Sequence, residues 1–214
     1  MTPRGPWARL SVCALAAVLL AGCAREAAPP PRVAPGPGAA VPPVVSRVPT
    51  RDKVVFLAYE DGAGRDPRFV DLVRDRRLPV SLFLAGAGAG AGGGRLGELS
   101  ALGVRVQNRT LTRPLLPGLG YVGQHAEICG QRDRVRARFG AAPRLLHPPR
   151  GAYDGNTLQA AAECGVDAIV LWRGPDGGRL RPGDILGARA GTTPRLLRRI
   201  EAEGYEVAAL EDYL

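Results

Sequence analysis

Apolar runs of strand length alternate with segments of helical periodicity from residue 53 to the end of the chain. Residues 54–59 (VVFLAY) are continuously apolar, as strands buried in a parallel sheet are, and 79–84 (PVSLFL) and 103–107 (GVRVQ) follow as further strands. Apolar positions from Phe69 to Val73 recur at helical spacing. They predict a helix between the first two strands.

The second half of the chain continues this alternation. A long helix is predicted over 121–139, because Gly140 suits the residue after a helix, and another is predicted from Asp154, a favourable N-cap, to about Cys164. A last helix runs from Thr193 to Gly204. The remaining predicted strands are 145–146, 166–172, 184–186 and 205–210. Strict alternation predicts an α/β domain with a parallel sheet, either doubly wound or closed into a barrel, with its functional groups at the carboxyl ends of the strands.

The first 22 residues are predicted to be an export signal and not part of the fold. Arg4 and Arg9 precede an apolar stretch over 10–20 that is too short to span a bilayer, and the sequence LAGC ends at Cys23. This ending is typical of a bacterial lipobox, in which Cys23 receives the lipid and anchors the protein to the outer face of the cell membrane. The alternative is an ordinary secretory signal with an incidental cysteine.

Residues 23–52 are rich in proline, alanine and glycine and are predicted to form an extended tether, with the folded domain over 53–214. The segment 85–94 (AGAGAGAGGG) contains a G-x-G-x-x-G match. Its repeat fits almost any glycine pattern, so we interpret it as a loop and not as a dinucleotide site.

The 214 residues carry a formal charge of +9 that is almost entirely arginine, since Lys53 is the only lysine. Such a charge suits an anionic membrane, an anionic glycan or nucleic acid, and export makes nucleic acid the weakest of these. Of the four cysteines, Cys129 and Cys164 lie in the predicted domain. An oxidising compartment favours a disulfide between them, with two independent buried thiols as the alternative.

Polar residues follow most of the predicted strands, and a parallel barrel would bring them to one face. These residues are Glu60 and Asp61, the segment 108–113 (NRTLTR), His147 with Arg150, Trp172 with Arg173, and Arg189.

These segments resemble, in order, the motifs of the polysaccharide deacetylases (carbohydrate esterase family 4, the NodB-homology domain). VFLAYEDGAG is similar to the first motif, NRTLTRP to the second and LLHPPRGAYD to the third, while VLW and GDILGAR resemble the fourth and fifth. The segments around Cys129 and Cys164 resemble a secreted actinobacterial branch of that family. The resemblance covers 53–214 and implies a distorted (β/α) barrel.

The resemblance also implies an amide-hydrolysing site in which two histidines and an aspartate hold a divalent metal, commonly zinc. A second aspartate serves there as the general base and a further histidine as the general acid. In this sequence Asp61 matches the metal-binding aspartate and Glu60 stands at the position of the base. Arg109 and Arg113 take the positions of both histidine ligands, and Arg189 that of the acid. Guanidinium has no lone pair to donate and stays charged, so we expect metal catalysis to be lost and no cofactor to be required.

Two functions follow from this pattern, and a domain without a ligand that acts through a protein partner is left open as a third. The first is a non-catalytic lipoprotein that binds cell-wall polysaccharide or another anionic envelope polymer. Its binding residues would be Arg109, Arg113, His147, Arg150, Tyr153 and Trp172. The arginines could equally form an internal ion-pair network with Glu60 and Asp61, and Trp172 could be a core residue. The second is a surviving hydrolase that removes N-acetyl or O-acetyl groups, with Glu60 and His147 as a metal-free acid–base pair.

Overall fold

The computed structural model describes residues 40–86 and 93–214. The predicted export signal, the lipidation site at Cys23 and most of the glycine repeat lie outside these residues. Within the described part of the chain, no helix is long and apolar enough to cross a membrane.

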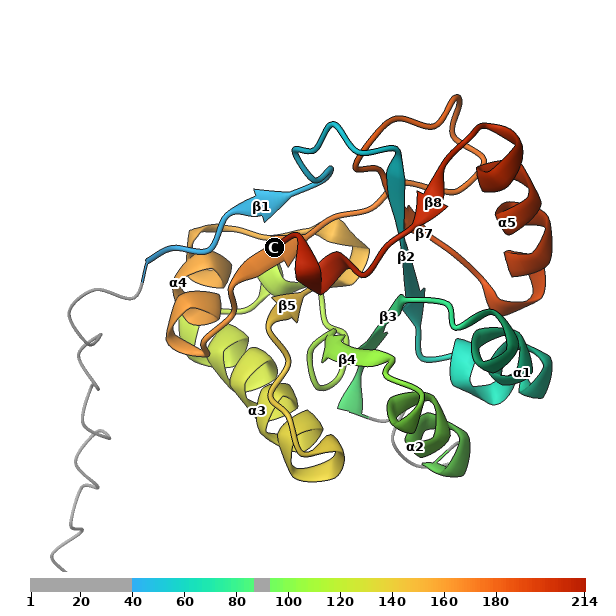
Figure 1. The fold of residues 1–214 in the computed structure, drawn as a ribbon. Coiled ribbons are helices and arrows are strands. Elements are labelled where there is room, and N and C mark those ends of the chain that lie inside the picture. The colour runs from blue at the N-terminus through green and yellow to red at the C-terminus, as the bar shows by residue number, and fades with distance from the viewer. Residues whose placement is uncertain (1–39, 87–92) are drawn as a thin grey trace, which may run out of the picture. The chain divides into compact units, whose positions relative to one another are not determined.

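Parallel strands form one curled sheet in the order β1-β6-β5-β4-β3-β2-β7, with β8 paired to β2 (Figure 1). The strands are β1 (Val44–Val45), β2 (Val54–Glu60), β3 (Val80–Leu84), β4 (Arg105–Asn108), β5 (Leu145–Leu146), β6 (Ala168–Val170), β7 (Ile185–Gly187) and β8 (Glu206–Val207). An isolated bridge between Arg47 and Asp184 joins the two outer edges of the sheet. The parallel sheet thus curls toward closure, and the predicted distorted (β/α) barrel is confirmed.

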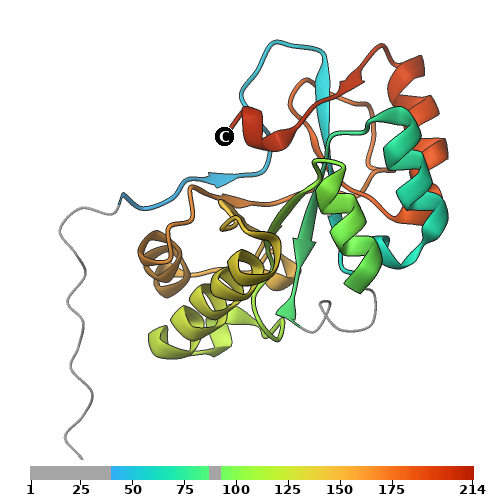
Figure 2. The ribbon, with the colours of Figure 1, turned by 60° about the horizontal axis from the view of Figure 1, so that its bottom comes forward.

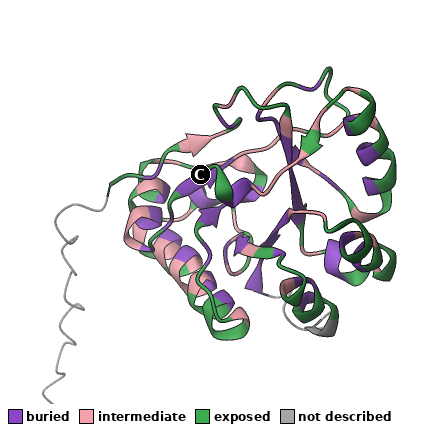
Figure 3. Ribbon diagram, in the orientation of Figure 1, coloured by how far each residue is buried: buried purple, intermediate pink, exposed green. Residues whose placement is uncertain are grey.

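Helices surround the outer surface of this sheet, as Figures 1 and 2 show. They are α1 (Pro67–Arg76), α2 (Gly93–Ala101), α3 (Tyr121–Phe139), α4 (Gly155–Glu163) and α5 (Thr193–Ala202). One apolar cluster lies between the sheet and α1, α2 and α5, and a second lies between the sheet and α3 and α4. A third fills the concave side of the sheet around Phe56 and Phe83, and Figure 3 shows how completely the central strands are buried.

The local signals for two helices are borne out by the structure. The side chain of Asp154 accepts a hydrogen bond from the Thr157 amide, and the Thr157 hydroxyl accepts one from the Asp154 amide, which completes a capping box at the start of α4. Gly140 ends α3 with a φ of 78°, a left-handed conformation that glycine adopts without steric cost.

The folded domain begins before the boundary predicted at Lys53. Val44 and Val45 pair with Ile169 and Val170 of β6, and Val48 is only 2% exposed. The Val48 amide also donates to the Gly183 carbonyl, at a contact so close that a Cβ on Gly183 would lie 1.9 Å from the Val48 carbonyl oxygen. The prolines around this segment led us to predict a tether. The segment forms a strand because the backbone groups at the edge of β6 need hydrogen-bond partners.

Two predicted strands are too long and one helix was missed. Only Ala168–Val170 of 166–172 and Glu206–Val207 of 205–210 are strands, although the amides of Leu171 and Ala208 next to them still donate to the carbonyls of Val45 and Val55. Helix α2 was not predicted, since its glycines obscure the helical spacing of Leu96 and Leu99, which are buried.

Candidate functional site

Asp61 follows β2 at the carboxyl edge of the sheet and is held in place by the neighbouring strand. Its Oδ1 atom accepts a hydrogen bond of 2.7 Å from the backbone amide of Ala85, directly after β3. The side chain is only 11% exposed. One carboxylate oxygen is therefore engaged by the backbone, and the other, Oδ2, faces the side chains that follow β4.

Arg109 extends from the end of β4 across this edge toward β2. Its backbone amide donates to the Leu84 carbonyl, and its side chain is 11% exposed. Nη2 lies 2.5 Å from Glu60 Oε1, and Nη1 lies 3.8 Å from Asp61 Oδ2. The buried Nε and Nη1 atoms have no hydrogen-bond partner in the structure. Arg109 thus places one buried positive charge between the two carboxylates.

Arg113 approaches the same carboxylate from a strained loop. Its Nη1 lies 3.6 Å from Asp61 Oδ2, while its side chain is 54% exposed. Thr110 and Arg113 both have positive φ, at 65° and 61°, a conformation that costs non-glycine residues of order 1–3 kcal/mol. The loop is stabilised by hydrogen bonds from the Thr110 amide to Asn108 Oδ1 and from the Arg113 amide to Thr110 Oγ1.

These residues do not form a ligand set for a divalent ion. Asp61 supplies one carboxylate whose free oxygen already faces two guanidinium groups, and neither guanidinium has an electron pair to donate. Together the two arginines balance the charge of the two carboxylates, and the guanidinium of Arg113 is partly exposed while doing so. Of the ion-pair network that the sequence left as an alternative, the pairs of Arg109 and Arg113 are found, whereas Arg150 and Arg189 form no ion pair with a described residue.

A pocket of about 430 Å³ opens beside this cluster, between the ends of β2 and β7. Glu60, Trp172 and Arg189 line it together, although they come from three segments far apart in the chain. The guanidinium of Arg189 makes no hydrogen bond or ion pair with any other described residue. The rest of the lining was missed from the sequence and consists of small residues next to the motifs: Ala58, Gly62, Ala63, Gly187, Ala188 and Ala190. Their lack of side-chain bulk leaves the space.

Trp172 belongs to both the core and the pocket. Its indole stacks on the His147 ring with centroids 3.3 Å apart, meets Phe83 edge-on at 5.1 Å, and lies over Gly187. A Cβ on Gly187 would stand 2.4 Å from the indole Cδ1, so glycine is required there. The indole is thus held rigidly at the wall of the pocket.

His147 is buried and neutral. Burial, together with the nearby charge of Arg109, lowers its pKa to about 4, against a backbone hydrogen bond that acts in the opposite direction. That bond joins Nδ1 to the Val170 carbonyl at 2.8 Å, so the imidazole carries its proton on Nδ1. In the described part of the chain Glu60 pairs with Arg109 and not with His147, which leaves the metal-free acid–base pair unformed.

Arg150 and Tyr153 follow β5 at the same edge of the sheet. Both side chains are exposed, Tyr153 by 38%, and Arg150 has a positive φ of 59°. Among the described residues neither lines the pocket nor contacts Asp61. They stand apart from the cluster that Arg109 organises.

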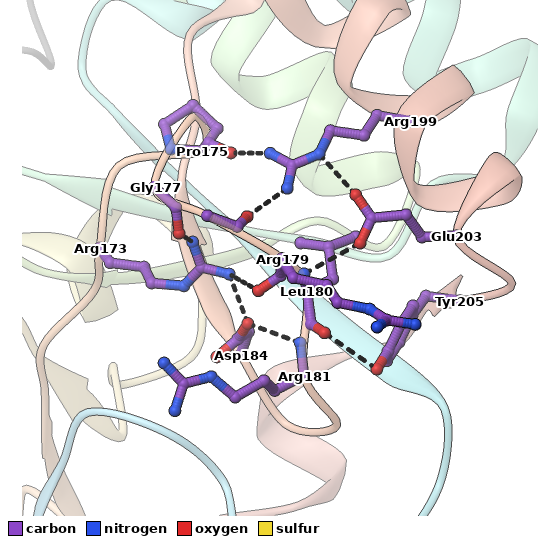
Figure 4. Close-up of polar contacts among 11 residues, drawn as sticks. Arg173, Pro175, Gly177, Arg179, Leu180, Arg181, Asp184, Arg199, Glu203 and Tyr205 are labelled. Carbon is purple, nitrogen blue, oxygen red and sulfur yellow. Dashed lines mark hydrogen bonds and ion pairs between the residues drawn. The ribbon is translucent and has the colours of Figure 1, made fainter.

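Two arginines fix the segment between Trp172 and β7 (Figure 4). Arg173 pairs with the buried Asp184 at 2.5 Å and donates to the carbonyls of the turn. Arg199 of α5 pairs with Glu203 at 2.8 Å and donates to the Pro175 carbonyl. The segment is therefore tied both to Asp184, just before β7, and to α5.

Cys129 of α3 and Cys164 at the end of α4 form a disulfide. This observation removes the alternative of two separate thiols. The disulfide lies between the two helices, and both cysteines belong to or pack against the apolar cluster that covers that side of the sheet.

Comparisons with known proteins agree with this architecture. The family model for polysaccharide deacetylases matches residues 47–169. An uncharacterized protein of Streptomyces coelicolor is 45% identical over 91% of this chain and 90% of its own length. A chitooligosaccharide deacetylase of Sinorhizobium fredii is 28% identical over 54% of this chain and 55% of its own.

Solved structures share the fold at low sequence identity. A wild-type CE4 family pseudoenzyme from Bacillus anthracis superimposes with a TM-score of 0.72 at 15% identity, over 81% of this chain and 69% of that one. The Bc1960 peptidoglycan N-acetylglucosamine deacetylase gives a TM-score of 0.70 at 18% identity, over 78% and 91% of the two chains.

Proposed function

Because the chain belongs to the polysaccharide deacetylase family, we propose that it is a non-catalytic member that binds an anionic polysaccharide of the cell envelope. The observation that carries this proposal is the position of Arg109. Its buried guanidinium lies between Glu60 and Asp61 and pairs with both of the carboxylates that metal-dependent hydrolysis would use.

Loss of hydrolysis follows from charge and from the missing ligands. At about 4 Å and an effective dielectric constant near 20, each guanidinium would repel a divalent ion by about 8 kcal/mol. A micromolar metal site has only about 8 kcal/mol of binding free energy in total. The charge on Arg109 alone is thus sufficient to cancel such a site. Glu60 is also occupied by its ion pair with Arg109 and is not free to act as a base.

Retention of binding is supported by the pocket and its unpaired charge. Arg189 lines the pocket with no partner among the described residues, and Arg113 is half exposed at the neighbouring cluster. Guanidinium groups bind carboxylate and phosphate through paired hydrogen bonds, and the fixed indole of Trp172 contributes an apolar part of the pocket wall. Cell-envelope polymers with uronic acid, lactyl or phosphate groups carry the complementary charge.

The location that we propose matches this ligand. A lipid on Cys23 would hold the domain at the outer face of the cell membrane, and the tether before β1 would let it reach the surrounding wall. The curated deacetylase relative acts on chitooligosaccharide and a solved structure of this fold is a peptidoglycan deacetylase, which supports a polysaccharide as the ligand class.

Two measurements test the proposal. The purified protein is incubated with acetylated chitooligosaccharide and with peptidoglycan, with and without added zinc, and acetate release is recorded. We expect none, and zinc-stimulated release would overturn the proposal in favour of a surviving hydrolase.

In the second measurement, co-sedimentation with purified cell wall is compared for the wild type, Arg189→Ala and Arg113→Ala. Arg136→Ala, an exposed arginine on α3 with the same loss of charge, is the matched control. We expect roughly tenfold weaker binding for the first two variants and little change for the control, because a charged hydrogen-bonded contact contributes about 1.5–3 kcal/mol. Equal binding by all four proteins would exclude the pocket as the binding site.

A further inference from the structure

A second group of chemically active side chains lies at the contact between α3 and α4, away from the pocket. The two helices lie side by side in both views (Figures 1 and 2). His125 and Cys129 are four residues apart on α3 and therefore share one face of the helix. His125 Nε2 lies 3.4 Å from Cys129 Sγ, the sulfur that is bonded to Cys164.

Three potential ligand atoms already converge at this contact. The His125 nitrogen and the two sulfurs all lie within 4.8 Å of one another. Glu163, the last residue of α4, adds a carboxylate oxygen 3.8 Å from His125 Nε2. Glu163 is held in this direction by hydrogen bonds from the Tyr121 hydroxyl and, at 3.1 Å, from Gln159.

The cluster is closed on one side and open on the other. Cys164 is fully buried, whereas the side chains of His125 and Glu163 are 40% and 20% exposed. An ion in solution can therefore reach the sulfurs from the side of His125. The buried side covers Cys164, whereas Cys129 is partly exposed.

We propose that reduction of the Cys129–Cys164 disulfide converts this cluster into a zinc site. A dithiol reductant transfers two electrons and two protons, so that its own sulfurs become a disulfide and the two cysteines become thiols. Zinc then displaces the two thiol protons and is bound by two thiolates, the imidazole of His125 and the carboxylate of Glu163. The ion would take the place of the disulfide as the link between α3 and α4.

The present geometry needs only a small change to meet the requirements of zinc. With Zn–S bonds of about 2.3 Å and Zn–N bonds of about 2.0 Å, neighbouring ligand atoms of a tetrahedral site lie roughly 3.4–3.8 Å apart. The pair His125–Cys129, at 3.4 Å, is already at this spacing, and the pair His125–Glu163, at 3.8 Å, is a few tenths of an ångström longer than a nitrogen and an oxygen on one zinc ion require. The two sulfurs must separate, which reduction itself permits, and the Glu163 carboxylate, which is not among the atoms that lie within 4.8 Å of one another, must move toward them. Two thiolates also favour zinc over the harder ions magnesium and calcium.

The experiment uses the full chain with Cys13→Ser and Cys23→Ser, so that Cys129 and Cys164 are the only cysteines. The protein is kept oxidised or reduced with a phosphine under nitrogen, and Co²⁺ is titrated as a spectroscopic substitute for zinc. We expect one equivalent to bind to the reduced protein, with thiolate charge-transfer and intense tetrahedral bands that zinc abolishes. The oxidised protein should show neither.

Variants assign the ligands. His125→Ala and Glu163→Gln keep the disulfide, so each can be purified folded and then reduced, and each should weaken Co²⁺ binding by at least about tenfold. Glu201→Gln, an exposed carboxylate on α5, is the matched control and should bind as the parent does.

Two results would overturn the proposal. One is a reduced parent protein without thiolate–cobalt bands. The other is unchanged affinity in both His125→Ala and Glu163→Gln, which would indicate adventitious binding by free thiols. Neither result bears on cell-wall binding, because that assay is carried out with the disulfide intact.

Discussion

Replacing Arg109 and Arg113 together by histidine should create a metal site that the natural sequence excludes. The change removes two positive charges, at 3.8 and 3.6 Å from Asp61 Oδ2, and introduces two imidazoles in their place. With Asp61 as the third ligand, the variant would have the two nitrogens and one carboxylate that zinc accepts in catalytic sites.

The size of the repulsion between zinc and a guanidinium predicts that both arginines must be replaced for tight zinc binding. A dication about 4 Å from one remaining guanidinium loses about 8 kcal/mol, which equals the whole binding free energy of a micromolar site. Solvent screening reduces this penalty at Arg113, which is 54% exposed, more than at Arg109, which is 11% exposed. Of the two single variants, Arg109→His should therefore bind zinc more tightly than Arg113→His, and the double variant should bind it most tightly, at micromolar affinity or better.

Isothermal calorimetry on the oxidised protein, again with Cys13→Ser and Cys23→Ser, measures these affinities. The double variant Arg109→Gln with Arg113→Gln is the control, because it removes the same charges without supplying imidazole nitrogens. Circular dichroism establishes that each variant is folded. A folded histidine double variant that binds no zinc would refute the placement of these side chains around Asp61.

Three further predictions concern the surroundings of the site. The pKa of His147 falls from 6.5 to about 4 on folding, so the unfolded chain takes up a proton before the folded protein does as the pH drops. The free energy of unfolding, measured by urea denaturation, should therefore decrease by roughly 3 kcal/mol between pH 6.5 and 4. Gly187→Ala should displace the Trp172 indole, since the new Cβ would lie 2.4 Å from it, and the near-UV circular dichroism and cell-wall binding should both be reduced. Replacing Cys129 and Cys164 by serine opens a loop with a sequence separation of 35 residues and should lower the free energy of unfolding by about 3–4 kcal/mol in denaturant titration.

Each of these three has its own control. His147→Asn retains a donor for the Val170 carbonyl but does not titrate, so an unchanged pH dependence in that variant would contradict the role of His147. Gly97→Ala, where a Cβ meets nothing within 4 Å, should leave the near-UV signal as it is. The reduced parent is the control for the serine variant. If both have the same free energy of unfolding as the oxidised parent, the disulfide contributes nothing to stability.

Local patterns in the sequence predicted most of the scaffold. The alternation of apolar runs and helical segments is enough to indicate a parallel sheet, because each strand and helix follows from its own residues. The positions of Glu60, Arg109 and Arg189 at the ends of three predicted parallel strands placed them at one edge of the sheet. The sequence did not predict β1, since Val44 and Val45 are too few to form a pattern and gain their pairing only from the exposed edge of β6.

The sequence by itself determined which chemical groups stand at the carboxyl edge of the sheet, including the guanidiniums where histidines would be needed, because residue types and their order need no coordinates. Only the tertiary structure decided which of these groups are buried, which form ion pairs and which remain exposed. Arg109 is buried against Glu60 and Asp61, Arg113 is half exposed and Arg189 faces a pocket without a partner. Burial and pairing depend on side chains brought together from distant segments, and electrostatic interactions in a partly buried site depend on ångström distances that no local pattern encodes.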